Sequence, residues 1–222
     1  MKSLLLIAFT FVIGFAIAQP RVVTFESDDN LEEEQSGYDM NVLKISLFEL
    51  AAGDFPIYYE RVISNSFSAE VSLGLTIGDY TASVFSDYDT PFSNNIDAQY
   101  GYSFSVALRF YPIESLNDFY ISPEFKFRNF NWSRDIEQYN PYPPYEDVIS
   151  QTVDETRSYL MPRINLGYIT FYDNNLSFDW HIGVGMNTPT ESVFDYQTLQ
   201  VESEKLNTRP RFHFGFKIGY IF

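Results

Sequence analysis

The most constraining feature of this sequence is a strict alternation of side-chain type in residues 211–222. Every even-numbered residue there is aromatic or isoleucine, and the odd-numbered residues as far as Gly219 are charged, histidine or glycine. Successive side chains of a β-strand point to opposite faces of the sheet, so the alternation predicts a strand with one apolar and one polar face. So many aromatic side chains on one face suit a sheet whose apolar face meets lipid and whose polar face lines an interior.

Seven earlier stretches alternate in the same way and are separated by turn-forming residues. Their approximate bounds are 41–50, 55–63, 67–80, 99–111, 119–132, 156–172 and 176–188. The longer polar segments, about 81–98, 133–155 and 189–206, are expected to be loops. An even number of strands with alternating short turns and long loops predicts an all-β fold, a transmembrane antiparallel up-and-down β-barrel of eight strands. The first and eighth strands must pair, because lipid cannot satisfy the hydrogen bonds of an exposed strand edge.

The residues before the first stretch form two segments of different composition. Residues 1–18 combine Lys2, an apolar run and the small-residue site Ala16-Ile17-Ala18, which predicts a cleaved secretory signal peptide. Residues 19–40 carry many acidic side chains and one base, which predicts a disordered acidic leader in the periplasm. Residues 41–222 are then the barrel, and the expected location is the outer membrane of a Gram-negative bacterium.

Charged side chains fall on the polar face of the predicted strands, and Arg61 is the only base of these strands on the apolar face. A charge facing lipid at mid-depth costs about 2–4 kcal/mol, so this sorting supports the assignment of the faces independently. The interior of an eight-stranded barrel is just wide enough for side chains, which predicts a lumen filled by a charge network. A narrow pore for ions or small solutes is the alternative. The residues expected in the lumen are Lys44, Glu60, Glu70, Arg109, Glu124, Lys126, Arg128, Arg163, Asp179, His181, Arg211, His213 and Lys217.

The predicted signal peptide, eight strands and terminal Phe222 together resemble small OmpA-like and OmpX-like outer-membrane β-barrel proteins of Gram-negative bacteria. The segment 57–62, Ile-Tyr-Tyr-Glu-Arg-Val, resembles the second strand of small uncharacterised porin-family-like barrels. The resemblance implies that Tyr220 and Phe222 belong to the signal read by the barrel-assembly machinery. Lys217 departs from that signature, which usually has glycine at this position.

No constellation of catalytic or metal-binding residues is evident in the sequence. His181 and His213 fall on the face of neighbouring strands that is predicted to point into the lumen, but they lack a recognised metal-ligand spacing. No lipid-facing pair of serine and histidine can be built to supply a nucleophile and its base. We therefore expect a protein that is not an enzyme and that holds no metal or cofactor. The alternatives are a metal held by the two histidines and an outer-membrane enzyme that acts on lipid A.

The formal net charge of −16 argues against nucleic acid as a partner, and the absence of cysteine excludes disulfides and thiolate metal sites. The predicted outer loops are acidic, so divalent cations or a surface partner are their candidate ligands. In the longest loop, Tyr139, Tyr142 and Tyr145 alternate with prolines and could form a recognition surface. The expected role is display of these loops for envelope integrity, adhesion or partner binding.

Two further expectations concern the faces of the sheet. Aromatic residues at the strand ends are expected in interfacial girdles, with Tyr111 and Tyr120 on the periplasmic side and Trp132 and Tyr159 on the outer side. A soluble exported barrel with an apolar ligand would invert the faces and place phenylalanine and leucine inside.

Overall fold

The computed structural model describes residues 40–80, 96–113, 115–116, 118–139, 148–172 and 175–222. The chain divides into two compact units, residues 1–35 and 36–222, and every described residue belongs to the second. The expected signal peptide at 1–18 lies outside the described residues, as does the leader at 19–40 except for its last residue. Among the residues described, no helix combines the length and the apolar character needed to cross a membrane.

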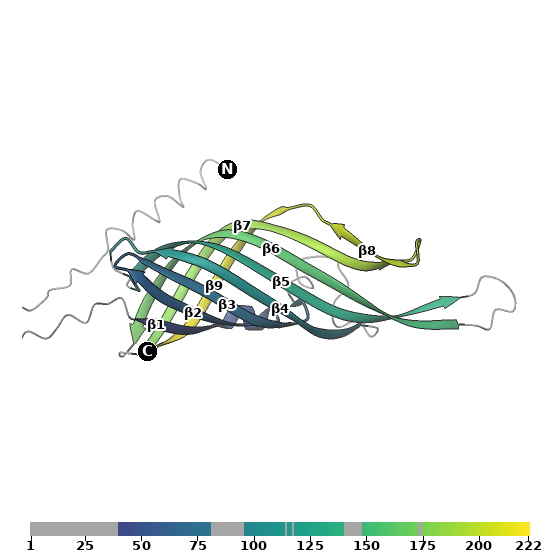
Figure 1. Ribbon diagram of the computed structural model, residues 1–222, viewed down its shortest axis with the longest axis horizontal. Helices are drawn as coiled ribbons and strands as arrows, with labels where there is room; N and C mark the ends of the chain where they lie inside the picture. The colour runs from purple at the N-terminus through teal and green to yellow at the C-terminus, as the bar shows by residue number, and fades with distance from the viewer. Residues whose placement is uncertain (1–39, 81–95, 114, 117, 140–147, 173–174) are drawn as a thin grey trace, which may run out of the picture. The chain divides into compact units, whose positions relative to one another are not determined.

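The described part of the chain is almost entirely antiparallel β-sheet with one short helix (Figure 1). Its elements are β1 (Asn41–Ser46), α2 (Leu47–Ala51), β2 (Asp54–Ser64), β3 (Phe67–Ile77), β4 (Ile96–Phe110), β5 (Asp118–Tyr139), β6 (Val148–Tyr172), β7 (Leu176–Asp195), β8 (Gln200–Lys205) and β9 (Arg209–Ile221).

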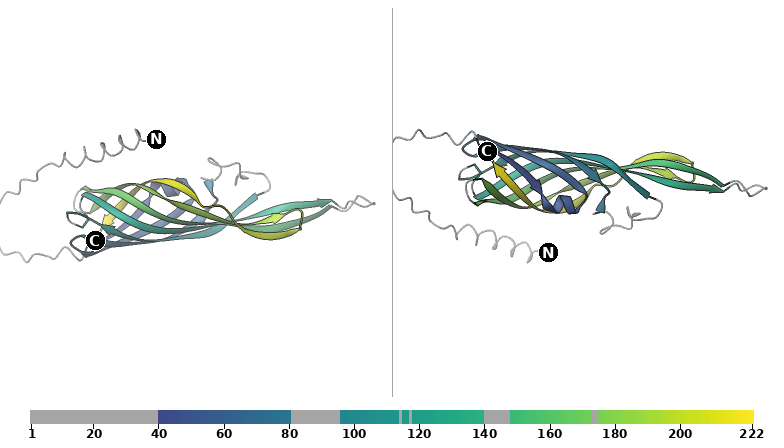
Figure 2. Two further views of the ribbon diagram at one scale, coloured as in Figure 1. Left: turned by 90° about the horizontal axis from the view of Figure 1, so that it is seen from above. Right: turned by 90° about the horizontal axis from the view of Figure 1, so that it is seen from below.

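Eight of these strands close into a ring. Strands β1 to β6 pair consecutively, β6 pairs with β7, β7 pairs with β9, and β9 returns to β1. The short strand β8 lies outside the ring, paired with the far end of β7. Figure 2 shows the yellow strand β9 beside the purple β1, where the ring closes. The predicted eight-stranded, antiparallel ring with pairing of its first and last strands is therefore confirmed.

The two faces of the ring differ sharply in chemistry, as strand β3 shows. Its odd-numbered residues Val71, Leu73 and Leu75 point outward, and Leu73 is 75% exposed. The intervening Ser68 and Glu70 point inward and are buried. The period of two places apolar side chains outside and polar side chains inside, so the inverted arrangement with an apolar interior is wrong.

The first departure from the sequence prediction is the helix α2, which replaces the second half of the expected strand at 41–50. Strand β1 ends at Ser46, and the chain turns through one helical turn before Gly53, whose φ of +83° starts the approach to β2. Residues 47–52, Leu-Phe-Glu-Leu-Ala-Ala, include good helix formers. As a result, β1 and β9 share only five residue pairs, whereas β7 and β9 share twelve.

The second departure lies in the segments expected to be loops, 133–155 and 189–206. Strands β5 and β6 remain paired as far as Tyr139 and Val148, and Figure 1 shows them running on side by side beyond the ring. Strand β7 continues to Asp195 and pairs with β8 to form a second ribbon. Three buried apolar side chains, Ile136, Val153 and Phe194, pack together between the two ribbons. Only residues 140–147 of the longest segment lie outside the described part.

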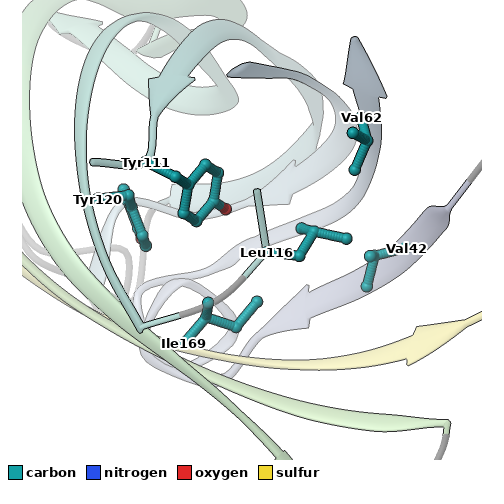
Figure 3. Packing of buried hydrophobic residues seen from close by; sticks show 6 residues of the cluster. All are labelled: Val42, Val62, Tyr111, Leu116, Tyr120 and Ile169. Carbon is teal, nitrogen blue, oxygen red and sulfur yellow. The ribbon is translucent and has the colours of Figure 1, made fainter. Parts of the chain in front are cut away.

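One end of the ring interior is filled by an apolar cap (Figure 3). Leu116, from the β4–β5 connection, lies among the other members of the cap in Figure 3. This connection is anchored by the Ser115 amide, which donates to the carbonyl oxygen of Asn65 at 2.6 Å. The cap contains Val42, Val62, Tyr111, Leu116, Tyr120 and Ile169.

The cap corrects one expectation about the aromatic residues, and a second buried cluster corrects another. Tyr111 and Tyr120 are 0% and 1% exposed inside the ring, so their assignment to an interfacial girdle is wrong. Tyr159 is also buried, packed with Phe130, Met161 and the partly buried Trp132, so the outer-girdle assignment of Tyr159 and Trp132 is wrong too. Their positions follow strand parity rather than the chemical preference of aromatic rings for interfaces.

Candidate functional site

The charged side chains inside the ring form two clusters, each with three acids and three bases. The proximal cluster lies next to the apolar cap. It consists of Lys44, Glu60, Glu70, Arg109, Asp179 and Lys217. The distal cluster consists of Glu49, Asp54, Glu124, Lys126, Arg128 and Arg163.

In the proximal cluster every charge has at least one opposite charge in contact. The Lys44 ammonium contacts Glu60 and lies 3.0 Å from Asp179 Oδ2. Arg109 Nη1 lies 2.7 Å from the same Asp179 oxygen, and its Nη2 donates to Glu70. Lys217 Nζ lies 2.6 Å from Glu70 Oε1. Buried charges of this kind are tolerated when they are paired and hydrogen-bonded, as they are here.

Two phenols of the apolar cap complete the bonding of the proximal carboxylates. The Tyr111 hydroxyl donates to Glu60 at 2.8 Å, and the Tyr120 hydroxyl donates to Asp179 Oδ1 at 2.6 Å. The Arg109 guanidinium also lies over the Tyr120 ring, 4.3 Å from its centroid. The same two tyrosines therefore close the interior on one side and hydrogen-bond the charge cluster on the other.

The carboxylate oxygens of Glu60, Glu70 and Asp179 lie within 4.8 Å of one another, a density of oxygen ligands that suits a divalent cation. Here the Lys44 ammonium and the Arg109 guanidinium already contact all three carboxylates. The cationic side chains thus take the place that a metal would occupy, and the chemistry of the donor set does not call for one.

The distal cluster depends on two acids that the sequence reasoning did not select, Glu49 and Asp54. Lys126 Nζ lies 2.7 Å from Glu49 and 3.0 Å from Asp54. Arg128 bridges the same two carboxylates at 3.1 Å and 2.8 Å. Asp54 has the parity of Glu60 on β2 and could have been found by starting that strand one residue earlier. Glu49 points inward only because α2 turns the chain, so strand periodicity gives no signal for it.

The remaining distal pair is bidentate. Arg163 Nε and Nη2 each donate to a Glu124 oxygen at 2.7 Å, and Asn165 Nδ2 donates to Glu124 at 2.6 Å. This parallel fork geometry is the strongest form of arginine–carboxylate pairing.

Tyr58 connects the two clusters. Its hydroxyl accepts a hydrogen bond from Lys126 Nζ at 3.0 Å and donates to Glu49 of the distal cluster. The Lys217 ammonium of the proximal cluster lies 3.7 Å from the centroid of the Tyr58 ring. The charges therefore form one continuous column across the interior.

Inward-facing glycines make room for the long side chains of neighbouring strands. A Cβ at Gly167 would overlap the Tyr120 phenol, and a Cβ at Gly215 would overlap the His181 imidazole. A Cβ at Gly185 would meet the Arg163 Cβ and the backbone beside it. The polar-or-glycine face seen in the sequence thus has a packing basis, since each glycine position is covered from the adjacent strand.

The structure places the thirteen sequence-predicted lumen residues in two groups. Eleven are buried, and Arg211 and His213 are half-buried. His181 Nδ1 lies 3.9 Å from Asp179 Oδ1, and His213 Nδ1 lies 3.2 Å from Arg163 Nη1. The group of three possible metal ligands found among the described residues contains neither histidine.

The other predicted site residues lie at the ends of strands. Tyr220 and Phe222 are outward and exposed, and the Phe222 amide donates to the Asn41 carbonyl oxygen at 3.0 Å. Tyr139 is the last residue of β5. Tyr142 and Tyr145 lie outside the described residues, so the tyrosine recognition surface stays a prediction.

A polar cavity of about 260 Å³ lies where the two ribbons leave the ring. Trp132 Nε1 donates to Glu155 at 2.6 Å, and Arg157 Nε lies 2.7 Å from Glu191 Oε1. Arg157 also lies 5.4 Å from the centroid of the Trp132 indole. The cavity therefore combines an aromatic surface with charged groups of both signs.

Comparison with known proteins gave no relative. No protein-family model, no curated protein and no solved structure matches this sequence.

Proposed function

We propose that this chain is an outer-membrane β-barrel protein of a Gram-negative bacterium, non-enzymatic, with a lumen filled by its own side chains. The observation that carries the proposal is a closed ring of eight antiparallel strands that is apolar outside and charged inside. Closure removes open sheet edges, whose backbone hydrogen bonds lipid cannot satisfy, except along residues 209–216 of β9, where helix α2 packs in place of a strand. Insertion through the barrel-assembly machinery, with Tyr220 and Phe222 in its signal, is part of the proposal.

The role that we propose for the barrel is to support its two ribbons and the loops between strands. Each charge cluster is neutral, so the net charge of −16 resides on residues outside them. Acidic ribbons and the cavity around Trp132 form one end of the described structure. Envelope integrity, adhesion and binding of a partner at this end are the proposed uses.

A membrane test addresses the class of the protein. Cells producing the full chain would be fractionated, the membranes washed with alkaline carbonate, and the detergent extract run on a gel with and without boiling. We expect the protein in the washed membranes and a change of migration on boiling, because a closed barrel resists detergent until heated. Recovery in the carbonate supernatant, or in water without detergent, would contradict the proposal.

A narrow channel is the second candidate function, and the polar interior is the observation that favours it. The paired clusters and the cap around Leu116 oppose it, because they occupy the interior. Purified protein in planar bilayers distinguishes the two functions. We expect no reproducible conductance steps above the protein-free bilayer. Regular steps from the natively folded protein would establish the channel and exclude the filled lumen.

A further inference from the structure

The inner face of β9 carries a buried hydrogen-bond donor with no acceptor. Arg163 Nη1 lies 3.2 Å from His213 Nδ1, and a guanidinium can only donate. In the neutral imidazole, Nδ1 is therefore the acceptor and Nε2 carries the proton. His213 Nε2 is buried and has no hydrogen-bond partner among the described residues.

Arg211, two residues earlier on the same face, is a second unmatched donor. It is half-buried and has no hydrogen bond or salt bridge with a described residue; the acid whose charge acts on it, Asp79, accepts a hydrogen bond from the Tyr159 hydroxyl. Its guanidinium offers five N–H groups and no acceptor. Buried or half-buried polar groups are usually matched, so two unmatched donors on one strand face require an explanation.

The charges around these donors select the sign of a ligand. The acids of the distal cluster, Glu49, Asp54 and Glu124, are already paired with its bases. Arg211 therefore adds a positive charge beside a neutral cluster, where the charges of Arg128 and Arg163 repel it and the charge of Asp79 attracts it. An anion with several oxygen atoms would supply both the charge and the acceptors that the site lacks.

The wall of the ring is incomplete beside this site. On the side of β1, strand β9 is paired only at residues 217–221, so 209–216 have no strand partner there within the described chain. The helix α2 packs there instead, with the Phe48 and Phe214 rings 4.8 Å apart. Phe212 points outward and is 86% exposed. An anionic group with an attached apolar chain could place the anion against Arg211 and His213 and the chain against the outward-facing Phe212.

We propose that Arg211 and His213, with Arg163 behind them, form a binding site for a phosphate-class oxyanion. The oxyanion could be free phosphate or the phosphomonoester head group of a lipid, since the two share the same chemistry. The site rests on the unmatched donors of β9 and does not depend on the role proposed for the ribbons.

The test uses the full chain folded in detergent micelles and phosphorus NMR titration. One arm adds inorganic phosphate, and the other adds phosphatidic acid to the micelles. We expect saturable binding in at least one arm, and roughly ten- to hundredfold weaker binding for Arg211→Gln, because a charge-assisted bond is lost. Binding in the first arm alone identifies a free anion, and binding in the second alone identifies a lipid head group.

The matched control is Arg209→Gln, which removes the same charge from an exposed position of the same strand. It should bind as the wild type does. His213→Phe should weaken binding while keeping the net charge at neutral pH. Because Arg211 contacts no described acid, its variants should keep the wild-type migration on unboiled gels, and Arg211→Lys provides a second variant that retains the charge. Equal weakening by the Arg209 and Arg211 changes, or no saturable binding in either arm, would overturn the site.

Discussion

Arg109 is the central cation of the proximal cluster, where it contacts Asp179, Glu60 and Glu70. Its side chain is 2% exposed, and every contact is made away from water. In such surroundings the attraction between opposite charges offsets a large desolvation cost only while the partners remain in place. The net stabilisation from such a buried ion pair is small, but removal of Arg109 would leave buried carboxylates without a partner, which is strongly destabilising.

Replacement of Arg109 by leucine should therefore destabilise the protein by about 3–5 kcal/mol, the cost of an uncompensated buried charge. The free energy of unfolding would be measured by urea titration in detergent or lipid. The double variant Arg109→Leu with Glu70→Gln restores the charge balance, so it should be more stable than the sum of the single effects predicts. Strict additivity of the two changes would contradict the network.

At the scale of single residues, the sequence predicts the face of a side chain well and its partner poorly. The parity of Lys44, Glu60 and Arg109 places them inside, as the structure does. Tyr111 and Tyr159 have inward parity too, yet their chemistry suggested an interface, and the parity was the better guide. The pairing of acids with bases depends on the register between neighbouring strands. The alternation of residues along a single strand gives no information about that register.

The helix α2 is the element that periodicity could not predict. Leu43, Ile45 and Leu47 continue a strand pattern, and nothing in a period of two marks its end at Ser46. What holds the helix is the inward Glu49, bonded by Tyr58, Lys126 and Arg128. The tertiary contacts of one carboxylate therefore override the local alternation.

Replacement of Glu49 by alanine should release α2 without opening the rest of the ring. The amides of Ala52 and Gly53, which donate to carbonyl oxygens of α2, should exchange their hydrogens faster with deuterated water. Amides in the middle of β5 and β6 should keep the wild-type rate. Glu204→Ala, on the exposed strand β8, is the control and should change neither region.

The ribbons also escaped prediction, for a different physical reason. Residues 200–205, Gln-Val-Glu-Ser-Glu-Lys, are all exposed, so no apolar face marks the strand. Pairing with β7 continues because backbone hydrogen bonds extend an existing ladder. In β6 the ribbon does bury alternate residues, but Glu155 and Arg157 are among them, so the buried face is not apolar in the sequence.

For the molecule as a whole, the decisive feature is closure between β1 and β9. Leu43 and Tyr220 face each other across this seam and both point outward. Since the chain has no native cysteine, the variant Leu43→Cys with Tyr220→Cys offers a clean pair for a short bifunctional maleimide. Intramolecular cross-linking should be efficient in the folded protein, detected by mass and by migration after boiling.

The control pairs Tyr220→Cys with Leu73→Cys, which also points outward but lies on β3, away from the seam. It should cross-link poorly within one chain. Equal yields in the two variants, or none at the seam, would show that the ring does not close as described.

The seam is shorter than the other side of β9, five residue pairs against twelve, and it joins strands from opposite ends of the described chain. Loop closure costs entropy that grows only slowly with length, by about 0.6 kcal/mol per doubling. Pairing of such distant segments is nevertheless slow, because the chain loses the entropy of loop closure before any stabilising contact between the segments has formed. Pairing of residues 217–221 with β1 is thus expected to be the rate-limiting step of folding. Before that step, the sheet would be complete except for these closing pairs. In unfolding, the lifetime of the folded state would depend on the rate at which the five residue pairs between β1 and β9 separate together.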